Sequence, residues 1–198
     1  MKLIGITGGV GAGKSAILSY LEDNYNCRVE LADIIAHKVK EPGQPCYDAL
    51  VELLGKEVLD EDGTINKGRM ADIIFSDDAK LEAVNALIHP AVKAYFLAEV
   101  EKEREIGKLE YFFLEAALLI EDGYEKIVDE LWYIYASEET REKRLRESRG
   151  YSEEKIKSIM AEQLSEEEFR AHCAFVIDNN YSLENTYQQI DRKLRADK

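Results

Sequence analysis

Five short apolar runs alternate along the chain with longer stretches in which apolar residues recur every three or four positions. The runs cover 3–7, 28–31, 110–114, 131–136 and 175–178, and the third and fourth are rich in aromatic and branched residues. Their length and apolar character predict buried strands. The stretches between them predict helices, beginning with Ile17, Leu18 and Leu21 after the first run. We therefore expect an α/β fold with a five-stranded parallel sheet, helices on both faces and ligands at the carboxyl edge of the strands.

The loop after the first run is rich in glycine. Residues 8–15, GGVGAGKS, match the complete P-loop pattern of a P-loop NTPase. Glycines let successive backbone N–H groups point at a phosphate, and a helix beginning near Lys14 directs its positive end at the same anion. Lys14 is expected to reach the β- and γ-phosphates, and the Ser15 hydroxyl to ligate Mg²⁺. The expected phosphate-binding residues are Gly9, Val10, Gly11, Ala12, Gly13, Lys14, Ser15 and Ala16. The motif alone leaves open whether the phosphate is transferred, hydrolysed or only sensed.

Two helical stretches are longer than a simple crossover between strands requires. The first, from Asp33 to about Lys108, contains turn residues at 42–45 and 60–63 and the pair His89-Pro90, each of which is expected to end a helix. We interpret it as an insertion that builds a substrate pocket beside the P-loop. The second, 137–170, is strongly charged, and we interpret its arginine cluster at 141–149 as a lid over phosphate; the alternative is a solvated helix face.

Length indicates one domain of 198 residues with insertions. The expected division is a core of 1–32, 109–137 and 171–198, an inserted helical domain of 33–108 and a lid of 138–170.

The chain is acidic, with a formal net charge of −14. This balance argues against a broad nucleic-acid surface, although a small anion can still bind in a locally basic cleft. No apolar run is long enough to span a membrane, and the first strand leaves no room for a signal peptide. Three widely spaced cysteines form neither a metal pattern nor a disulfide framework. We expect a monomeric protein of the reducing cytoplasm.

Three classes of P-loop protein were compared with the remaining motifs. A GTPase needs an Asn-Lys-x-Asp motif after a late strand, whereas Asn66-Lys67 here is followed by Gly68-Arg69 in a helical region. A motor or transporter ATPase is usually larger. A small-molecule kinase fits better, because it needs a compact P-loop domain, a substrate cap and a lid that excludes water from ATP. A non-enzymatic nucleotide sensor remains an alternative of a different class.

Two carboxylates are placed to assist phosphoryl transfer. Asp33 follows the second strand and is therefore expected at the carboxyl edge of the sheet, where it could accept the proton of an attacking hydroxyl. Its alternative role is to cap a helix over residues 34–39. Glu115 follows the third strand and could position Mg²⁺ or its water; the alternative is an ordinary surface acid.

The chain resembles the dephospho-CoA kinases over nearly its whole length. The segments that carry the resemblance are 6–15 (ITGGVGAGKS), 32–36 (ADIIA), 62–63 (DG), 73–75 (IIF), 87–92 (LIHPAV), 118–121 (LLIE) and 176–179 (VIDN), with Arg144-Leu145, Arg149-Gly150 and Gln163. Apart from the P-loop, no segment is specific alone, but their order and spacing together are.

The resemblance implies transfer of the ATP γ-phosphate to the ribose 3′-hydroxyl of dephospho-CoA, the last step of coenzyme A synthesis. It implies a helical CoA domain, a lid, and ATP and Mg²⁺ as cofactors. The residue roles that it implies are catalysis by Asp33, Lys14, Arg144 and Arg149, nucleotide binding by Asn179 besides the P-loop, substrate binding by Asp33, His89 and Lys67, and metal binding by Ser15 and Glu115. For His89 a structural role at the helix junction is the favoured alternative. Another small-molecule or nucleoside-monophosphate kinase is the runner-up.

The chain departs from the family pattern at five positions. Leu31, Ala117 and Phe175 stand where aspartate, proline and aspartate are frequent. Glu115 replaces a usual aspartate, and Lys67 replaces a frequent arginine, which keeps the charge but loses bidentate geometry toward phosphate. These departures bear on substrate affinity and the metal shell more than on the activity.

Overall fold

The computed structural model describes residues 1–196; residues 197 and 198, the end of the expected core segment 171–198, lie outside the described residues. The chain divides into two compact units. The first, called the core unit here, combines residues 1–29 with the chain from 108 onward. The second, called the helical unit, comprises residues 30–107.

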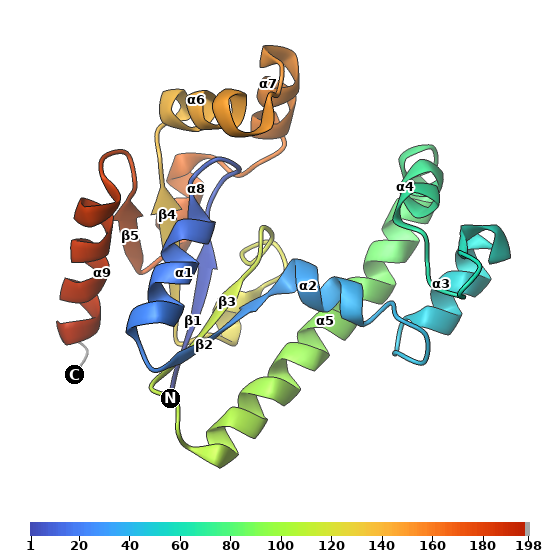
Figure 1. Ribbon diagram of the computed structural model, residues 1–198, viewed down its shortest axis with the longest axis horizontal. Helices are drawn as coiled ribbons and strands as arrows, with labels where there is room; N and C mark the ends of the chain where they lie inside the picture. Colours follow the sequence, from blue (N-terminus) through green and yellow to red (C-terminus); the bar gives the residue numbers. More distant parts are fainter. Residues whose placement is uncertain (197–198) are drawn as a thin grey trace. The chain divides into compact units, whose positions relative to one another are not determined.

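A five-stranded sheet organises the core unit (Figure 1). The strands of the sheet are β1 (Lys2–Thr7), β2 (Cys27–Leu31), β3 (Tyr111–Glu115), β4 (Glu130–Tyr135) and β5 (Phe175–Asp178), in the order β2-β3-β1-β4-β5. The last two residues of β2, 30 and 31, are counted in the helical unit. The central strand β1 runs parallel to both neighbours, so Ile6 lies beside Glu115 of β3 and Trp132 of β4. The expected five-stranded parallel sheet is confirmed. This order brings the P-loop and the ends of β3 and β4 to the same carboxyl edge.

Aromatic side chains fill much of the core unit. Ring centroids are 5.9 Å apart for Tyr111 and Phe113, 5.7 Å for Phe113 and Trp132, and 5.2 Å for Trp132 and Phe175. Phe113 and Trp132 are fully buried. Large aromatic surfaces removed from water supply much of the stability of such a core.

Serine residues at the N-cap positions set the starts of three helices of the core unit. The helices of this unit are α1 (Lys14–Asn24), α6 (Glu138–Arg149), α7 (Glu153–Ala161), α8 (Glu166–His172) and α9 (Leu183–Ala196), with a short 3₁₀ turn, η2 (Tyr124–Lys126). In the charged stretch between β4 and β5, the hydroxyls of Ser137, Ser152 and Ser165 accept hydrogen bonds from the first turns of α6, α7 and α8. Each serine satisfies a backbone N–H that the helix itself leaves unpaired, so the stretch folds as three short helices.

The helical unit is built around one long helix, α5 (Asp78–Ile106). Its other elements are α2 (Ala32–Lys38), α3 (Tyr47–Leu54), η1 (Lys56–Val58) and α4 (Lys67–Phe75). The buried residues of α5 recur every four positions at Val84, Ile88, Val92, Phe96 and Val100. This spacing forms one apolar stripe on the helix, and α2, α3 and α4 pack against α5.

The expectation that His89-Pro90 ends a helix is wrong. Pro90 lies inside α5, which continues to Ile106 and ends at Gly107 with φ 67°. Proline removes one backbone hydrogen bond, but the apolar stripe continues on both sides of it, from Ile88 to Val92. The packing of this stripe therefore outweighs the tendency of Pro90 to break the helix.

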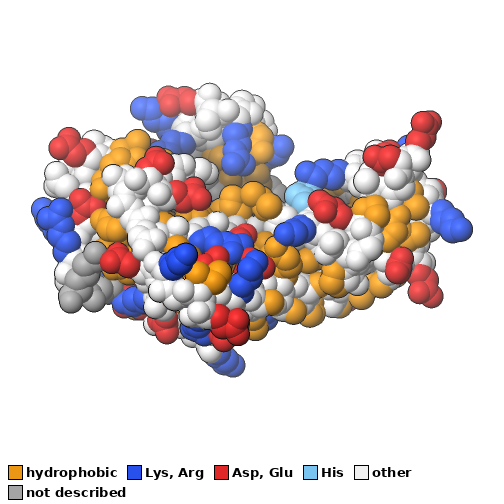
Figure 2. All heavy atoms as spheres, turned by 60° about the horizontal axis from the view of Figure 1, so that its bottom comes forward, with side chains coloured by type: hydrophobic (Ala, Val, Ile, Leu, Met, Phe, Trp, Pro, Cys, Tyr) orange, Lys and Arg blue, Asp and Glu red, His pale blue; other side chains and the backbone are white. Residues whose placement is uncertain are grey.

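Charges of both signs are spread over the surface. Figure 2 shows acidic and basic side chains interspersed on the face that it presents. Among residues 1–196, no helix is long and apolar enough to cross a membrane.

Candidate active site

The P-loop lies between β1 and α1. As the sequence predicts, α1 begins at Lys14, and the residue before it, Gly13, has φ 90°. A positive φ is strained for a residue with a Cβ, which explains glycine at this position. Lys14 Nζ donates a hydrogen bond of 2.7 Å to the Gly8 carbonyl and lies 3.4 Å from Glu115 Oε1. The Lys14 ammonium group is therefore held against the backbone of the P-loop, where it is expected to contact phosphate.

Glu115 lies at the end of β3, where the sequence places it. Its side chain and that of Lys14 are both largely buried, so their charges interact with little screening by water. Ser15, in the first turn of α1, is exposed. Within the described chain, no group of three or more His, Cys, Asp or Glu side chains could hold a metal. A divalent ion at this site would therefore depend largely on phosphate and water oxygens, as Mg²⁺ often does.

The last residue of β1 marks an incomplete polar site beside the P-loop. Thr7 is fully buried, and its hydroxyl has no hydrogen-bond partner within residues 1–196. Buried hydroxyls normally have a partner. Together with the glycine loop and Lys14, this unsatisfied hydroxyl fits a site that is completed by a polar ligand.

Arg144 and Asn179 fasten the middle of the P-loop. The Arg144 guanidinium donates to the carbonyls of Ala12 at 3.2 Å and Asn179 at 2.7 Å. The buried Asn179 amide donates to the same Ala12 carbonyl at 2.7 Å and accepts from the Thr186 hydroxyl at 2.9 Å. Two residues expected at the site thus converge on one P-loop residue from α6 and from the end of β5.

Arg141 and Gln163 form a second contact with the P-loop, which we call the lid clamp. Arg141 Nε donates to the Val10 carbonyl at 2.8 Å, and its guanidinium also donates to Gln163 Oε1. Val10 N donates to the same Gln163 oxygen at 3.3 Å. Burial lowers the pKa of Arg141. A Cβ added at Gly9 would overlap the Arg141 guanidinium, so a side chain there would displace Arg141 from the lid clamp.

No individual role at the site was predicted for Arg141 or Gln163. Arg141 was visible only as one member of an arginine cluster, and Gln163 only as part of the family pattern. Arg149, which was expected at the site, is exposed, and its guanidinium carbon lies 5.8 Å from the centre of the Tyr151 ring. The structure brings Arg144 to the P-loop and leaves Arg149 on the outer part of α6.

Asp33 lies in the helical unit, in the first turn of α2. The alternative that it caps a helix over 34–39 is wrong, because α2 already begins at Ala32 and its N-cap is Leu31. The Asp33 side chain is exposed. A carboxylate in the first turn interacts favourably with the helix dipole, but it remains open to a ligand.

Lys67 and His89 complete the expected substrate residues of the helical unit. Lys67 is the first residue of α4, which Asn66 caps by accepting a hydrogen bond from Arg69 N at 3.0 Å. His89 lies within the continuous helix α5. Because no helix junction exists there, the alternative that His89 fixes one is wrong.

A family model described as dephospho-CoA kinase matches residues 2–185 of this chain. The chain belongs to the dephospho-CoA kinase family. Proteins of this family catalyse the final step of coenzyme A biosynthesis, with ATP as a substrate.

Individual comparisons support membership of the dephospho-CoA kinase family. The chain is 37% identical to a dephospho-CoA kinase of Streptococcus mutans over 98% of this chain and 96% of the relative. It is 38% identical to one of Listeria innocua, over 96% and 94% of the two chains. The crystal structure of TT1252 from Thermus thermophilus superposes with a TM-score of 0.80 at 29% identity, covering 98% of this chain and 97% of the other.

Proposed function

We propose that this protein transfers the γ-phosphate of ATP to the ribose 3′-hydroxyl of dephospho-CoA, with the two substrates held by different units. The observation that carries this proposal is the P-loop of a dephospho-CoA kinase family member, in which Lys14 and Arg144 both lie on the loop backbone. Phosphoryl transfer depends mainly on positioned charge, and both cations are positioned before ATP arrives.

On the donor side, residues 9–16 and Asn179 would hold the ATP phosphates. Lys14 would exchange its contact with the Gly8 carbonyl for the β- and γ-phosphates. Arg144 would stabilise the charge that develops on the transferred group, and Arg149, the exposed last residue of α6, would have to move toward the P-loop to share this role. Since Arg144 is already bonded to Ala12 and Asn179, little reorganisation is needed for it to act.

On the acceptor side, Asp33 would orient the 3′-hydroxyl and accept its proton as the new O–P bond forms. Its exposed position supports this role, because a carboxylate that already served as a helix cap would have to give up that bond. Lys67 and His89 would contact the rest of the substrate.

We propose Ser15 and Glu115 as the protein ligands of Mg²⁺ or of its water. When bound, the ion would neutralise negative charge on the phosphates during transfer. Glu115 supports this assignment because it lies within 3.4 Å of the Lys14 ammonium, at the same edge of the sheet. We further propose that the protein works in the cytoplasm as a monomer and without nucleic acid.

A coupled ADP-release assay tests the proposed function. Dephospho-CoA is compared with AMP, shikimate and gluconate as acceptors, and ³¹P NMR identifies the phosphorylated position. We expect turnover with dephospho-CoA and a 3′-monophosphate product. Lys14→Ala is the matched inactive variant, because it removes the P-loop cation. Faster turnover of another acceptor would instead favour a different small-molecule kinase.

A further inference from the structure

A cavity within the helical unit lies outside the P-loop site described above. It has a volume of about 450 Å³ and is bounded by the end of α2, the turn over residues 60–65 and the start of α4. Three basic side chains line it, His37, Lys40 and Lys67. We call it the cation pocket. Its volume is within the range of small-molecule sites.

The basic side chains of the cation pocket lie close enough to repel one another. Burial and then the charges of Lys40 and Lys67 lower the pKa of His37. Burial and the charge of Lys67 likewise lower the pKa of Lys40, which is half-buried. Of the three, Lys40 is half-buried, whereas His37 and Lys67 are exposed. Like charges gathered beside a partly buried lysine favour the binding of an anion. Such an arrangement is typical of a binding site for an anionic ligand.

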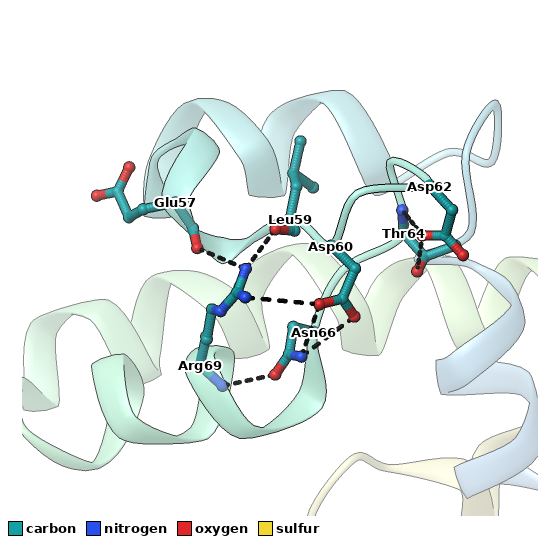
Figure 3. A network of polar contacts seen from close by, with 7 residues as sticks. All are labelled: Glu57, Leu59, Asp60, Asp62, Thr64, Asn66 and Arg69. Carbon is teal, nitrogen blue, oxygen red and sulfur yellow. Dashed lines mark hydrogen bonds and ion pairs between the residues drawn. The ribbon is translucent and has the colours of Figure 1, made fainter.

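Two acids also line the pocket, but they do not cancel this charge. Figure 3 shows Asp60 in contact with both Asn66 and Arg69. Its two oxygens accept from Asn66 Nδ2 at 2.9 and 3.1 Å, and Arg69 NH2 lies 3.7 Å away. Asp60 thus has its own cation outside the pocket. Glu41, the second acid, is exposed to solvent, as His37 and Lys67 are, so this single charge offsets only part of the basic charge of the pocket.

A further link connects the pocket to Asp33. Burial and the neighbouring lysine charges lower the pKa of His37 and Lys40, and the Asp33 carboxylate opposes this effect at both groups, after Cys46 in the case of Lys40. The proposed base and the pocket cations are therefore neighbours within one unit. In a nucleotide, the ribose 3′-hydroxyl and the 5′-phosphate are likewise only a few bonds apart.

We infer that the cation pocket binds the 5′-diphosphate of dephospho-CoA through Lys40 and Lys67, while the 3′-hydroxyl of the same nucleotide lies at Asp33. This inference rests on the proposed function. The diphosphate is the anionic part of dephospho-CoA, since its nucleoside and its pantetheine arm are uncharged. Lys67 is the first residue of α4, so the positive end of this helix lies at the wall of the pocket.

Lysine replacements test the assignment on the full-length protein. We expect Lys40→Met and Lys67→Met each to raise the KM for dephospho-CoA about tenfold or more, because each removes a charge-assisted contact to phosphate. The kcat at saturation and the KM for ATP should stay within about twofold of the parent, since the P-loop is untouched. Lys67→Arg should retain the low KM. Lys56→Met is the matched control, because Lys56 is an exposed lysine of the same unit outside the pocket.

A neutral ligand separates loss of the phosphate contact from general damage to the unit. Adenosine lacks the diphosphate, so its Ki as a competitive inhibitor against dephospho-CoA should be the same in the parent and both Met variants. Equal weakening of adenosine and dephospho-CoA would overturn the inference, as would an unchanged KM in both Met variants. In either case the parent still phosphorylates dephospho-CoA. Absence of that turnover in the parent would instead be a failure of the proposed function.

Discussion

At the scale of single residues, Asp33 lies where a substitution can change the chemistry of the site without changing the folding of the protein. Its side chain is exposed and caps no helix, because Leu31 holds the cap position of α2. Its electrostatic partners, His37 and Lys40, belong to the cation pocket. The carboxylate can therefore be altered with little effect on the packing of the helical unit.

We expect Asp33→Asn to lower kcat by roughly a hundredfold or more, because the amide keeps the size of the side chain but cannot accept a proton. ATP affinity should stay near the parent value. Calorimetry measures the ATP affinity of the parent and of Asp33→Asn, and a 3′-phosphorylation assay on the same preparations measures their kcat. Near-normal turnover with normal ATP binding would remove Asp33 from the chemistry, and Glu115 would become the carboxylate to test.

At the scale of elements, the lid clamp joins two helical segments to the P-loop. Arg141 comes from α6, and Gln163 from the connection between α7 and α8. Both bond Val10, so the lid helices and the phosphate loop are held as one assembly. Loosening the lid clamp should therefore weaken the binding of ATP more than the binding of the acceptor substrate.

We expect Gln163→Ala to raise the KM for ATP several-fold, since Val10 N and the half-buried Arg141 would both lose an acceptor. Hydrogen exchange at the Val10 amide should become faster. Arg146→Ala is the control on the lid, because Arg146 is exposed and pairs with Glu142 and Glu153 instead. Unchanged exchange at Val10 in Gln163→Ala would contradict the clamp.

The helix α5 gives a second prediction at this scale. We expect Pro90→Ala to stabilise the protein by about 1 kcal/mol, because alanine restores the backbone donor that proline lacks and is a far better residue for a helix interior. The larger freedom of the unfolded chain offsets part of this gain. Denaturant unfolding measures the change, and a loss of stability would show that proline is the better residue at this position.

The elements differ in how far the sequence alone could predict them. Each of the five strands and the start of α1 were predicted to within one residue, because continuous apolar runs and the glycine loop are local signals. Pro90 was misjudged because its local preference is overruled by packing spread along 29 residues of α5. The lid clamp and the cation pocket were missed for another reason. Each joins side chains separated by more than twenty residues, and no local pattern encodes such a pairing.

At the scale of the whole molecule, one carboxylate links distant parts of the core unit. Glu130 at the start of β4 accepts from Lys2 Nζ of β1 at 2.8 Å, from Lys193 Nζ of α9 at 3.1 Å and from Trp132 Nε1 at 2.9 Å. Burial alone would raise the pKa of Glu130, but these hydrogen bonds outweigh it and lower the pKa to about 2. The ionised form is thus favoured by folding.

This shift predicts the effect of acid on stability. The pKa of Glu130 is lower in the folded protein than its ordinary value of 4.5. Its contribution is therefore complete above about pH 4.5 and is lost as the pH falls toward 2. We expect Glu130→Gln to reduce the free energy of unfolding by roughly 1–3 kcal/mol at pH 7. The difference from the parent should vanish near pH 2.

Denaturant unfolding of both proteins at pH 7, 4 and 2.5 makes this measurement. Glu147→Gln is the control, because Glu147 is an exposed acid on α6. A difference between parent and Glu130→Gln that grew as the pH fell would contradict the assigned direction of the pKa shift.

The contact between Gly9 and Arg141 has a consequence for how this protein can change over generations. Any side chain at position 9 would meet the guanidinium that bonds Val10. A Gly9 substitution would therefore push the guanidinium away from Val10 while Arg141 is present, whereas a smaller residue at 141 would leave room for it. Substitutions at the two positions are expected to show epistasis.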